Sequence, residues 1–347
     1  MHLTELRIQN FRCLESVQLE PGAGLNFIVG ENGSGKSSLL EAIYFLARAD
    51  SFRHGTRVRL IRDGAGQLTV FGRLSDDTGM PTSAGVSYAD QNARIKLGTV
   101  DGATVLELVR ALPVQLIDPR LQQLLEEGPA WRRRFLDWGV FHVEHSFYEA
   151  WRRYRRALMQ RNHALRQGLP DAAVNVWNPE LAATGAEVDA CRRRHAGRLR
   201  DQVVALLQAE VGTVEVQYYA GWAQGVALAE ALAAGTARDR EAGHTGIGPH
   251  RADLRIKLQG VPVPERASRG EQKLVTAALL LAQAREVQAA TARRPILLID
   301  DLAAELGPHY RGWLLRQIAA LGMQAFLTFL QERDIPQSGL GPPMFHV

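Results

Sequence analysis

Residues 25–43 constrain this chain more than any other stretch, because they join a short apolar run to a glycine-rich turn and an amphipathic segment. The apolar run at 27–29 predicts a buried strand, and the residues from Ser37 onward predict a helix. The turn between them fits the pattern G-x-x-x-x-G-K-[ST], with its defining residues at Gly30, Gly35, Lys36 and Ser37. This order of strand, glycine-rich turn and helix predicts a phosphate-binding loop.

Each residue type in the turn has a chemical reason. Glycines let successive backbone N–H groups curl around a phosphate, and the helix N-terminus adds a partial positive charge. Lys36 can reach the β- and γ-phosphates of a nucleotide, and the Ser37 hydroxyl can bind Mg²⁺. The predicted nucleotide-binding residues of the loop are Gly30, Asn32, Gly33, Ser34, Gly35, Lys36, Ser37 and Ser38.

Composition narrows the class of protein. A chain of 347 residues with 46% hydrophobic and 22% charged residues is typical of a soluble globular protein of one large or two ordinary domains. No apolar run approaches the ~20 residues that span a bilayer, and no secretory signal is visible. Cys13 and Cys191 indicate neither a disulfide framework nor a zinc site. These features predict a cytoplasmic protein with no membrane association.

Alternating and apolar runs predict strands on both sides of a long helical stretch. The helical stretch covers about 121–212, and neither of its two main helices is expected to exceed about 30 residues, or ~45 Å. We therefore expect residues 1–120 and 213–347 to form one lobe and 121–212 to form a second, inserted lobe. The predicted strands lie near 6–8, 17–19, 68–74, 86–88, 95–97, 114–117, 214–216, 254–258, 296–299 and 325–329.

Two carboxylates end the apolar run at 296–299. Asp300 and Asp301 follow four buried-type residues, as in a strand that delivers an acidic group to the carboxyl edge of a parallel sheet. There Asp300 would hold Mg²⁺ and Asp301 would orient the attacking water. An ordinary strand with a solvated acidic end is the alternative.

A helix from about 270 to 291 begins next to Ser268 and Gly270. Ser268 is a plausible N-cap, and capping alone could explain its presence. The same hydroxyl and the backbone N–H groups of the helix N-terminus also form a potential second phosphate-binding surface. We expect Ser268 to lie far from Lys36 of its own subunit, and hypothesise that it contacts the nucleotide of a second copy.

The order of these motifs resembles the ABC-type ATPase heads of the SMC and Rad50 kind, and within them the RecF family. The resemblance rests on the phosphate loop together with Asn10-Phe11-Arg12, Gly128-Pro129, Arg132-Arg133-Arg134-Phe135-Leu136-Asp137, Gly248-Pro249-His250-Arg251, Ser268-Arg269-Gly270, Asp300-Asp301 and Ala304-Glu305-Leu306. It implies an α/β fold: an ATPase head with a mixed sheet and an antiparallel β meander, carrying an inserted helical lobe.

The resemblance also implies a function. It implies an ATPase with ATP and Mg²⁺ as cofactors, homodimerisation on ATP binding, and DNA binding at gaps or junctions in repair and replication. RecR- and RecO-type mediator proteins are the implied partners in loading the recombinase on single strands and supporting the SOS response. Among the residues, it implies that Arg12 approaches the nucleotide and that Gln115 links Mg²⁺ to the helical lobe. Ser268 and Gly270 would contact the γ-phosphate across the dimer.

Two positions help to distinguish the RecF family from other ATPases of this kind. Gly307 stands where the family usually has an aspartate after Glu-Leu, which puts one cross-dimer contact in doubt. Thr328 ends the strand at 325–327 where transporter ATPases have a histidine, which favours the RecF family over a transporter subunit.

Arginine dominates the positive charge, since only four of the 41 basic residues are lysines. Between Trp131 and Arg166 nine arginines face three carboxylates, which predicts a positive field that attracts a phosphodiester backbone. A solvated helix face is the alternative, and Arg133 and Arg134 could instead tie the helical lobe to the head. The rival functions are an ATPase subunit of another machine, either a transporter or a nuclease, and a small-molecule phosphotransferase.

Overall fold

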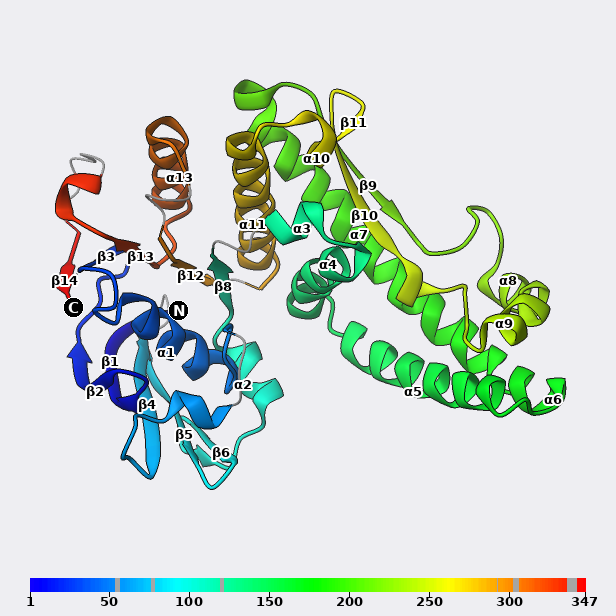
Figure 1. Ribbon diagram of the computed structural model, residues 1–347, viewed down its shortest axis with the longest axis horizontal. Coiled ribbons are helices and arrows are strands. Elements are labelled where there is room, and N and C mark those ends of the chain that lie inside the picture. The colour runs from blue at the N-terminus through cyan, green and yellow to red at the C-terminus, as the bar shows by residue number, and fades with distance from the viewer. Residues whose placement is uncertain (54–56, 76–78, 119–121, 292, 302–305, 336–341) are drawn as a thin grey trace. The chain divides into compact units, whose positions relative to one another are not determined.

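A computed structural model describes the chain from residue 1 to 347, apart from residues 54–56, 76–78, 119–121, 292, 302–305 and 336–341 (Figure 1). The chain divides into two compact units. The first comprises Met1–Leu121 and Val287–Val347, and the second comprises Gln122–Glu286. No helix in the described residues is both long and apolar enough to cross a membrane.

The first unit contains an antiparallel sheet of order β2-β1-β4-β5-β6-β7. Its burial pattern alternates, as in β4, where every second side chain is buried. One face therefore packs on the core, which is how an antiparallel sheet can keep its other face in water. The strands are β1 (His2–Phe11), β2 (Leu14–Leu19), β4 (Gln67–Ser75), β5 (Pro81–Ala89), β6 (Asn92–Leu97) and β7 (Val100–Asp101).

The second sheet of this unit is parallel, with the order β14-β3-β13-β12-β8. All residues of β3, β12 and β13 are buried, because a parallel sheet covered on both faces needs continuous apolar runs. Their carboxyl ends meet at one edge, which brings the segments after β3, β13 and β12 together. The strands are β3 (Leu25–Val29), β8 (Val114–Ile117), β12 (Ile296–Ile299), β13 (Ala325–Phe329) and β14 (Met344–His346).

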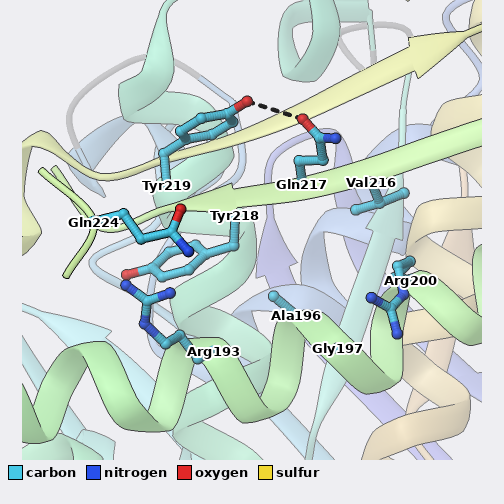
Figure 2. Close-up of a pocket in the computed structure, with 9 residues that line it drawn as sticks. All are labelled: Arg193, Ala196, Gly197, Arg200, Val216, Gln217, Tyr218, Tyr219 and Gln224. Atoms are coloured by element: carbon cyan, nitrogen blue, oxygen red, sulfur yellow. Dashed lines mark hydrogen bonds between the residues drawn. The ribbon is translucent and has the colours of Figure 1, made fainter. Parts of the chain in front are cut away.

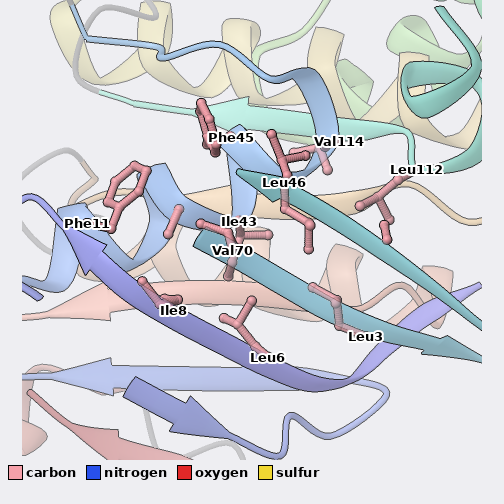
Figure 3. Close-up of a cluster of buried hydrophobic side chains, with 14 of the residues drawn as sticks. Leu3, Leu6, Ile8, Phe11, Ile43, Phe45, Leu46, Val70, Leu112 and Val114 are labelled. Carbon is pink, nitrogen blue, oxygen red and sulfur yellow. The ribbon is translucent and has the colours of Figure 1, made fainter. Parts of the chain in front are cut away.

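Helix α1 (Lys36–Arg48) contacts strands of both sheets of the first unit. Its buried side chains, among them Ile43, Phe45 and Leu46, join side chains from β1, β4 and β8 in one hydrophobic cluster (Figure 3). A helix buried on nearly all sides fixes the position of the turn that precedes it. The unit also contains η1 (Arg57–Leu60), α2 (Val105–Ala111), α13 (Pro308–Leu321) and η4 (Glu332–Asp334).

The second unit is mainly helical and carries a small sheet of order β11-β10-β9. Helix α7 has 34 residues, so it spans ~51 Å and is longer than the sequence-based limit of about 30 residues. The elements are α3 (Gln123–Glu126), α4 (Pro129–Val143), α5 (Phe147–Arg166), α6 (Asp171–Asn175), α7 (Asn178–Val211), β9 (Val214–Tyr219), α8 (Leu228–Ala234), α9 (Thr236–Ala242), η3 (Pro249–Arg251), β10 (Asp253–Leu258), β11 (Val261–Pro262) and α10 (Val263–Arg266).

The second unit ends at Glu286, whereas the sequence predicted that the chain returns to the first lobe after residue 212. Residues 213–286 group with the helices, because β9 contacts α7 and β10 contacts α4. Helix α11 (Arg269–Thr291) belongs to the second unit through Glu286 and to the first unit from Val287 onward.

Several arginines of the second unit hold its elements together rather than facing solvent. Arg161, one of the nine arginines between Trp131 and Arg166 that were expected to create a positive field, is instead fully buried and donates to Asp239 at 2.6 Å and to Thr245 at 2.8 Å. Arg132 binds both carboxylate oxygens of Asp253. Burying a guanidinium requires such paired acceptors, and these lie far away in the sequence.

His195 on α7 is buried and packs against α4, since a Cβ on Gly139 would lie 2.3 Å from its Nε2. Neither ring nitrogen has a hydrogen-bond partner among the described residues. Burial, with the charge of Arg198 as a smaller cause, lowers the pKa of His195 from 6.5 to about 4. The imidazole is therefore neutral in the folded protein at neutral pH.

This depressed pKa makes stability fall in mild acid. Between pH 6.5 and 4 the unfolded chain binds a proton that folded His195 does not, so the free energy of unfolding decreases as the pH falls. From pH 7 to pH 5 the loss assigned to this residue is about 2 kcal/mol. We expect His195→Leu to lose about 2 kcal/mol less than the wild type over that interval, as measured by urea unfolding. The control is His163→Leu at an exposed position of α5; an unchanged pH dependence in His195→Leu would contradict the prediction.

Candidate phosphate-binding site

The glycine-rich turn lies between β3 and α1, as the sequence predicted. A Cβ on Gly30 would lie 2.3 Å from the carbonyl oxygen of Val347 and 2.6 Å from Oγ of Ser34, so no larger residue fits there without movement. Gly35 caps α1 in a left-handed conformation, with φ of 115°, which favours glycine. The two outer glycines of the pattern are therefore required by this backbone path.

Lys36 and Ser37 begin α1 and are held by different partners. The Lys36 ammonium donates to the carbonyl oxygens of Gly30 and Glu31, at 2.6 and 2.8 Å. The Ser37 hydroxyl donates to Oδ1 of Asp300 at 2.9 Å across 263 positions of sequence. The loop and the end of β12 thus form one site.

Thr328 at the end of β13 orders the two aspartates. Its hydroxyl donates to Asp300 at 3.0 Å and accepts from the backbone N–H of Asp301 at 2.7 Å. Burial raises the pKa of Asp300, while the hydrogen bonds from Ser37 and Thr328 and the charge of Arg53 oppose this shift. A buried carboxylate beside a serine hydroxyl is a donor set that suits a divalent cation such as Mg²⁺.

A cavity of about 290 Å³ opens over these groups. The predicted residues that line it are Asn32, Gly33, Gly35, Lys36, Ser37, Ser38, Asp300 and Asp301. Four further lining residues escaped the sequence-based prediction, namely Cys13, Arg53, Thr328 and Leu330. Thr328 was noticed only as a substitute for histidine, and no motif pointed to Cys13 or Arg53.

Of the predicted loop residues, Gly30 and Ser34 support the cavity without lining it. The Ser34 hydroxyl is buried and has no hydrogen-bond partner in the described part of the chain. An orphaned donor inside a phosphate loop fits an anionic ligand, because a buried polar group without a partner is costly.

Arg12 does not line the cavity and has a structural contact instead. Its Nε and Nη2 donate to the two oxygens of Glu41 on α1, at 3.1 and 2.8 Å, and its Nη1 donates to the carbonyl oxygen of Arg59. Glu41 is fully buried and also accepts from Ser51. The guanidinium thus neutralises a buried carboxylate under the site, and the expected approach of Arg12 to the nucleotide stays a prediction.

Gln115 was predicted as a metal-linking residue, and the structure does not place it with the others. It is buried within β8, opposite Leu297 of β12, and does not line the cavity. A side chain in the middle of a strand lies away from the carboxyl edge where Asp300 lies. A metal-linking role for Gln115 therefore stays a prediction.

Ser268 and Gly270 lie in the second unit, whereas the cavity lies in the first. Ser268 is exposed and caps α11 in a reciprocal arrangement with Glu271: its N–H donates to the carboxylate at 2.7 Å and its hydroxyl accepts from the Glu271 N–H at 3.3 Å. The predicted N-cap is confirmed, and a phosphate contact in a second copy stays a prediction. Gly307 begins α13 as its N-cap, while Ala304 and Glu305 lie outside the described residues.

Comparison with known proteins identifies the family. The description "RecF/RecN/SMC N terminal domain" matches residues 2–338. The "DNA replication and repair protein RecF" of Chromohalobacter salexigens is 41% identical over 357 residues, which cover 100% of this chain and 98% of the relative. The protein of the same name from Thioalkalivibrio sulfidiphilus is 37% identical over 351 residues, with coverage of 100% and 98%. This chain belongs to the RecF family.

Solved structures agree on the fold. The "recombination mediator protein RecF-ATPrS in RecFOR pathway" matches with a TM-score of 0.88 at 24% identity, covering 100% of this chain and 96% of that chain. An "SmcHead bound to the C-winged helix domain of ScpA" matches with a TM-score of 0.59 at 15% identity, with coverage of 96% and 91%. The predicted α/β fold of RecF and SMC heads, with parallel and antiparallel sheets, is confirmed.

Proposed function

We propose that this protein is an ATP-dependent DNA-binding protein of recombinational repair and replication, and that slow ATP hydrolysis works as a switch. The observation that carries the proposal is the hydrogen bond between Ser37 and Asp300 beside Lys36. It unites the two motifs of a nucleotide–metal site from opposite ends of the chain. Membership of the RecF family and the names of its relatives supply the process.

The residues present fit a nucleoside triphosphate with Mg²⁺. Lys36 and the N-terminus of α1 would hold the phosphates, and Ser37 with Asp300 would hold the metal ion. The bound ion would neutralise charge on the phosphates, and Asp301 would orient the attacking water. The cavity, the closely packed Gly30 and the orphaned Ser34 hydroxyl support this assignment.

The DNA-binding surface that we propose lies on α5. Three exposed arginines of this helix have no ion-pair or hydrogen-bond partner among the described residues: Arg155, Arg156 and Arg166. Arg152, Arg156 and exposed Met159 have the spacing i, i+4 and i+7, so they lie on the same face of α5. By contrast, Arg132 and Arg133 bind Asp253 and the carbonyl of Ala252 inside the second unit. Backbone phosphates are the ligands that such unpaired arginines favour.

The function is tested by gel shift of a gapped duplex with and without ATP, at about 50 and about 200 mM salt. We expect ATP to tighten binding and salt to weaken it, because ATP would close a dimer on DNA and the contacts would be to phosphates. A DNA affinity that changes with neither ATP nor salt concentration would overturn the proposal. RecR- and RecO-type mediator proteins are the partners we propose for the complex on DNA.

The same assay tests the α5 surface. Replacing Arg155 and Arg156 by glutamate is expected to weaken DNA binding at least about tenfold and to reduce the salt slope by about two, one for each phosphate contact. The control reverses two charges at Arg94 and Lys96, exposed residues of β6 in the first unit. Equal losses in both variants would mean that only net charge matters, which would contradict a defined surface on α5.

Ser268 is expected to act in a second copy of the chain. Ser268→Arg should abolish ATP-dependent dimerisation in sedimentation velocity, since a bulky cation would replace the hydroxyl proposed to contact the γ-phosphate. Ser268→Asp serves as the control for capping, because aspartate also caps helices. The aspartate charge should still repel the γ-phosphate, so Ser268→Asp should also stay monomeric. Both variants should stay folded. An ATP-dependent dimer of Ser268→Arg would remove the proposed composite site.

A further inference from the structure

A second cavity, of about 490 Å³, lies in the second unit between α7 and β9 (Figure 2). The helix contributes Arg193, Ala196, Gly197 and Arg200 to its lining, and the strand contributes residues 216–219. The four helical residues have the spacing i, i+3, i+4 and i+7, so they share one face of α7. We call this cavity the β9 groove.

The strand presents an unpaired edge to the β9 groove. β9 is the outermost strand of its sheet and pairs only with β10 in the described chain. The N–H of Gln259 donates to the carbonyl of Thr213, so these two residues form a hydrogen-bonded pair of the antiparallel ladder. From Thr213 onward, every second residue of β9 directs its backbone N–H and C=O groups toward β10. Val216 and Tyr218 are the alternate residues, and their N–H and C=O groups therefore point to the open edge.

The floor of the β9 groove is kept clear by Gly197. A glycine inside a helix costs about 1 kcal/mol relative to alanine. A Cβ added at Gly197 would meet no atom within 4 Å, so no neighbour requires this glycine. Because Gly197 has no side chain, the space between it and β9 stays open.

Two arginines flank that space. Arg193 donates through Nε to Asp189 at 2.6 Å, and Arg200 donates through Nε to Asp201 at 2.9 Å. The terminal nitrogens of both guanidinium groups have no hydrogen-bond partner in the described ranges, and both side chains are about half exposed. Seven residues of α-helix separate the two arginines by about 10 Å, which is the length of about three residues of extended chain.

We propose that the β9 groove docks an extended segment of a partner protein, which adds as a strand beside β9 and carries carboxylates to Arg193 and Arg200. A peptide offers both donors and acceptors to the open edge of β9, and this mode of strand addition is common in peptide recognition. A DNA backbone offers acceptors only, so it cannot donate to the C=O groups of Val216 and Tyr218. The groove therefore favours an acidic peptide over DNA.

The experiment selects phage-displayed random decapeptides on the full-length wild-type chain and measures the selected peptides by fluorescence polarisation. We expect enrichment in Asp and Glu. Gly197→Leu, which fills the floor, and Arg200→Glu, which reverses one flank, should each weaken binding at least about tenfold, equivalent to about 1.4 kcal/mol. Gly197→Ala is the matched control and should bind within about twofold of the wild type, because one methyl group leaves most of the space.

Folding of every variant is checked by thermal unfolding, and leucine at 197 should raise helix stability rather than lower it. Three results would overturn the proposal: no selected peptide, selected peptides without acidic enrichment, or peptides that bind Gly197→Leu and Arg200→Glu as well as the wild type. A thymidine 20-mer is tested in parallel. If the oligonucleotide but no peptide loses affinity for Gly197→Leu, the groove binds nucleic acid and the proposal is wrong.

Discussion

Lys36→Met is expected to weaken ATP binding by at least about a hundredfold. The ammonium now donates to two loop carbonyls, at 2.6 and 2.8 Å, and lines the cavity. With a nucleotide bound, these donors can turn to phosphate oxygens, and each hydrogen bond between charged groups is worth about 1.5–3 kcal/mol. Two such bonds correspond to about two to four powers of ten in affinity. Isothermal titration calorimetry with ATP and Mg²⁺ gives the dissociation constant directly.

The matched control for this change is Lys96→Met. Lys96 is exposed on β6 and does not line the cavity, so its loss should leave ATP affinity within about twofold. Both variants should stay folded, because Lys36 lies outside the hydrophobic core and donates to two carbonyls of its own loop. ATP affinity that stays within about fivefold in Lys36→Met would refute the assignment of the loop as the nucleotide site.

Arg192→Met is expected to destabilise the second unit by about 3–5 kcal/mol, the cost of removing the buried partner of an ion pair. Arg192 is fully buried, and its Nε and Nη2 donate to the two oxygens of Asp137 at 2.7 and 2.9 Å. Its Nη1 donates to the carbonyl of Pro249 at 2.6 Å, and the guanidinium lies 5.2 Å from the ring centre of Trp151. The single side chain thus ties three other segments to α7.

The measurement is urea unfolding followed by circular dichroism. Arg194→Met is the control two positions along α7, where an exposed arginine pairs with Glu144 and should contribute at most about 1 kcal/mol. The double variant Arg192→Met with Asp137→Leu removes both charges and should recover part of the loss, because no unpaired carboxylate remains. Equal stability of Arg192→Met and Arg194→Met would contradict the structural role of Arg192.

Local patterns carried much of the prediction. The phosphate loop, the buried strand at 296–299 and the cap at Ser268 were recognised because each signal lies within a few neighbouring residues. The main strands were also found, since period-two and continuous apolar runs report burial directly. The length of α7 was underestimated because its early turns lack a strong apolar stripe. The helix nevertheless continues from Asn178 to Val211, since no residue in between interrupts it.

Roles that depend on distant partners were predicted less well. Arg12 and Gln115 were assigned to the nucleotide by family resemblance, and these roles stay predictions; what the sequence did not show is that Arg12 neutralises buried Glu41 and that Gln115 lies inside β8. Arg161 was counted toward the predicted positive field, but the structure pairs it with Asp239, 78 positions away. The partners of an arginine cannot be read from its neighbours in sequence, because a guanidinium reaches whatever carboxylate the packing brings near.

The sequence by itself determined the loop that can bind phosphate, because a strand, three glycines, a lysine and a helix start suffice for that chemistry. Only the tertiary structure decided which residues complete the site. Parallel pairing of β3, β13 and β12 brings Ser37, Thr328 and Asp300 to one sheet edge. The same holds for the β9 groove: its open edge exists because β9 pairs only with β10 in the part of the chain that the structure describes, and α7 forms its other wall.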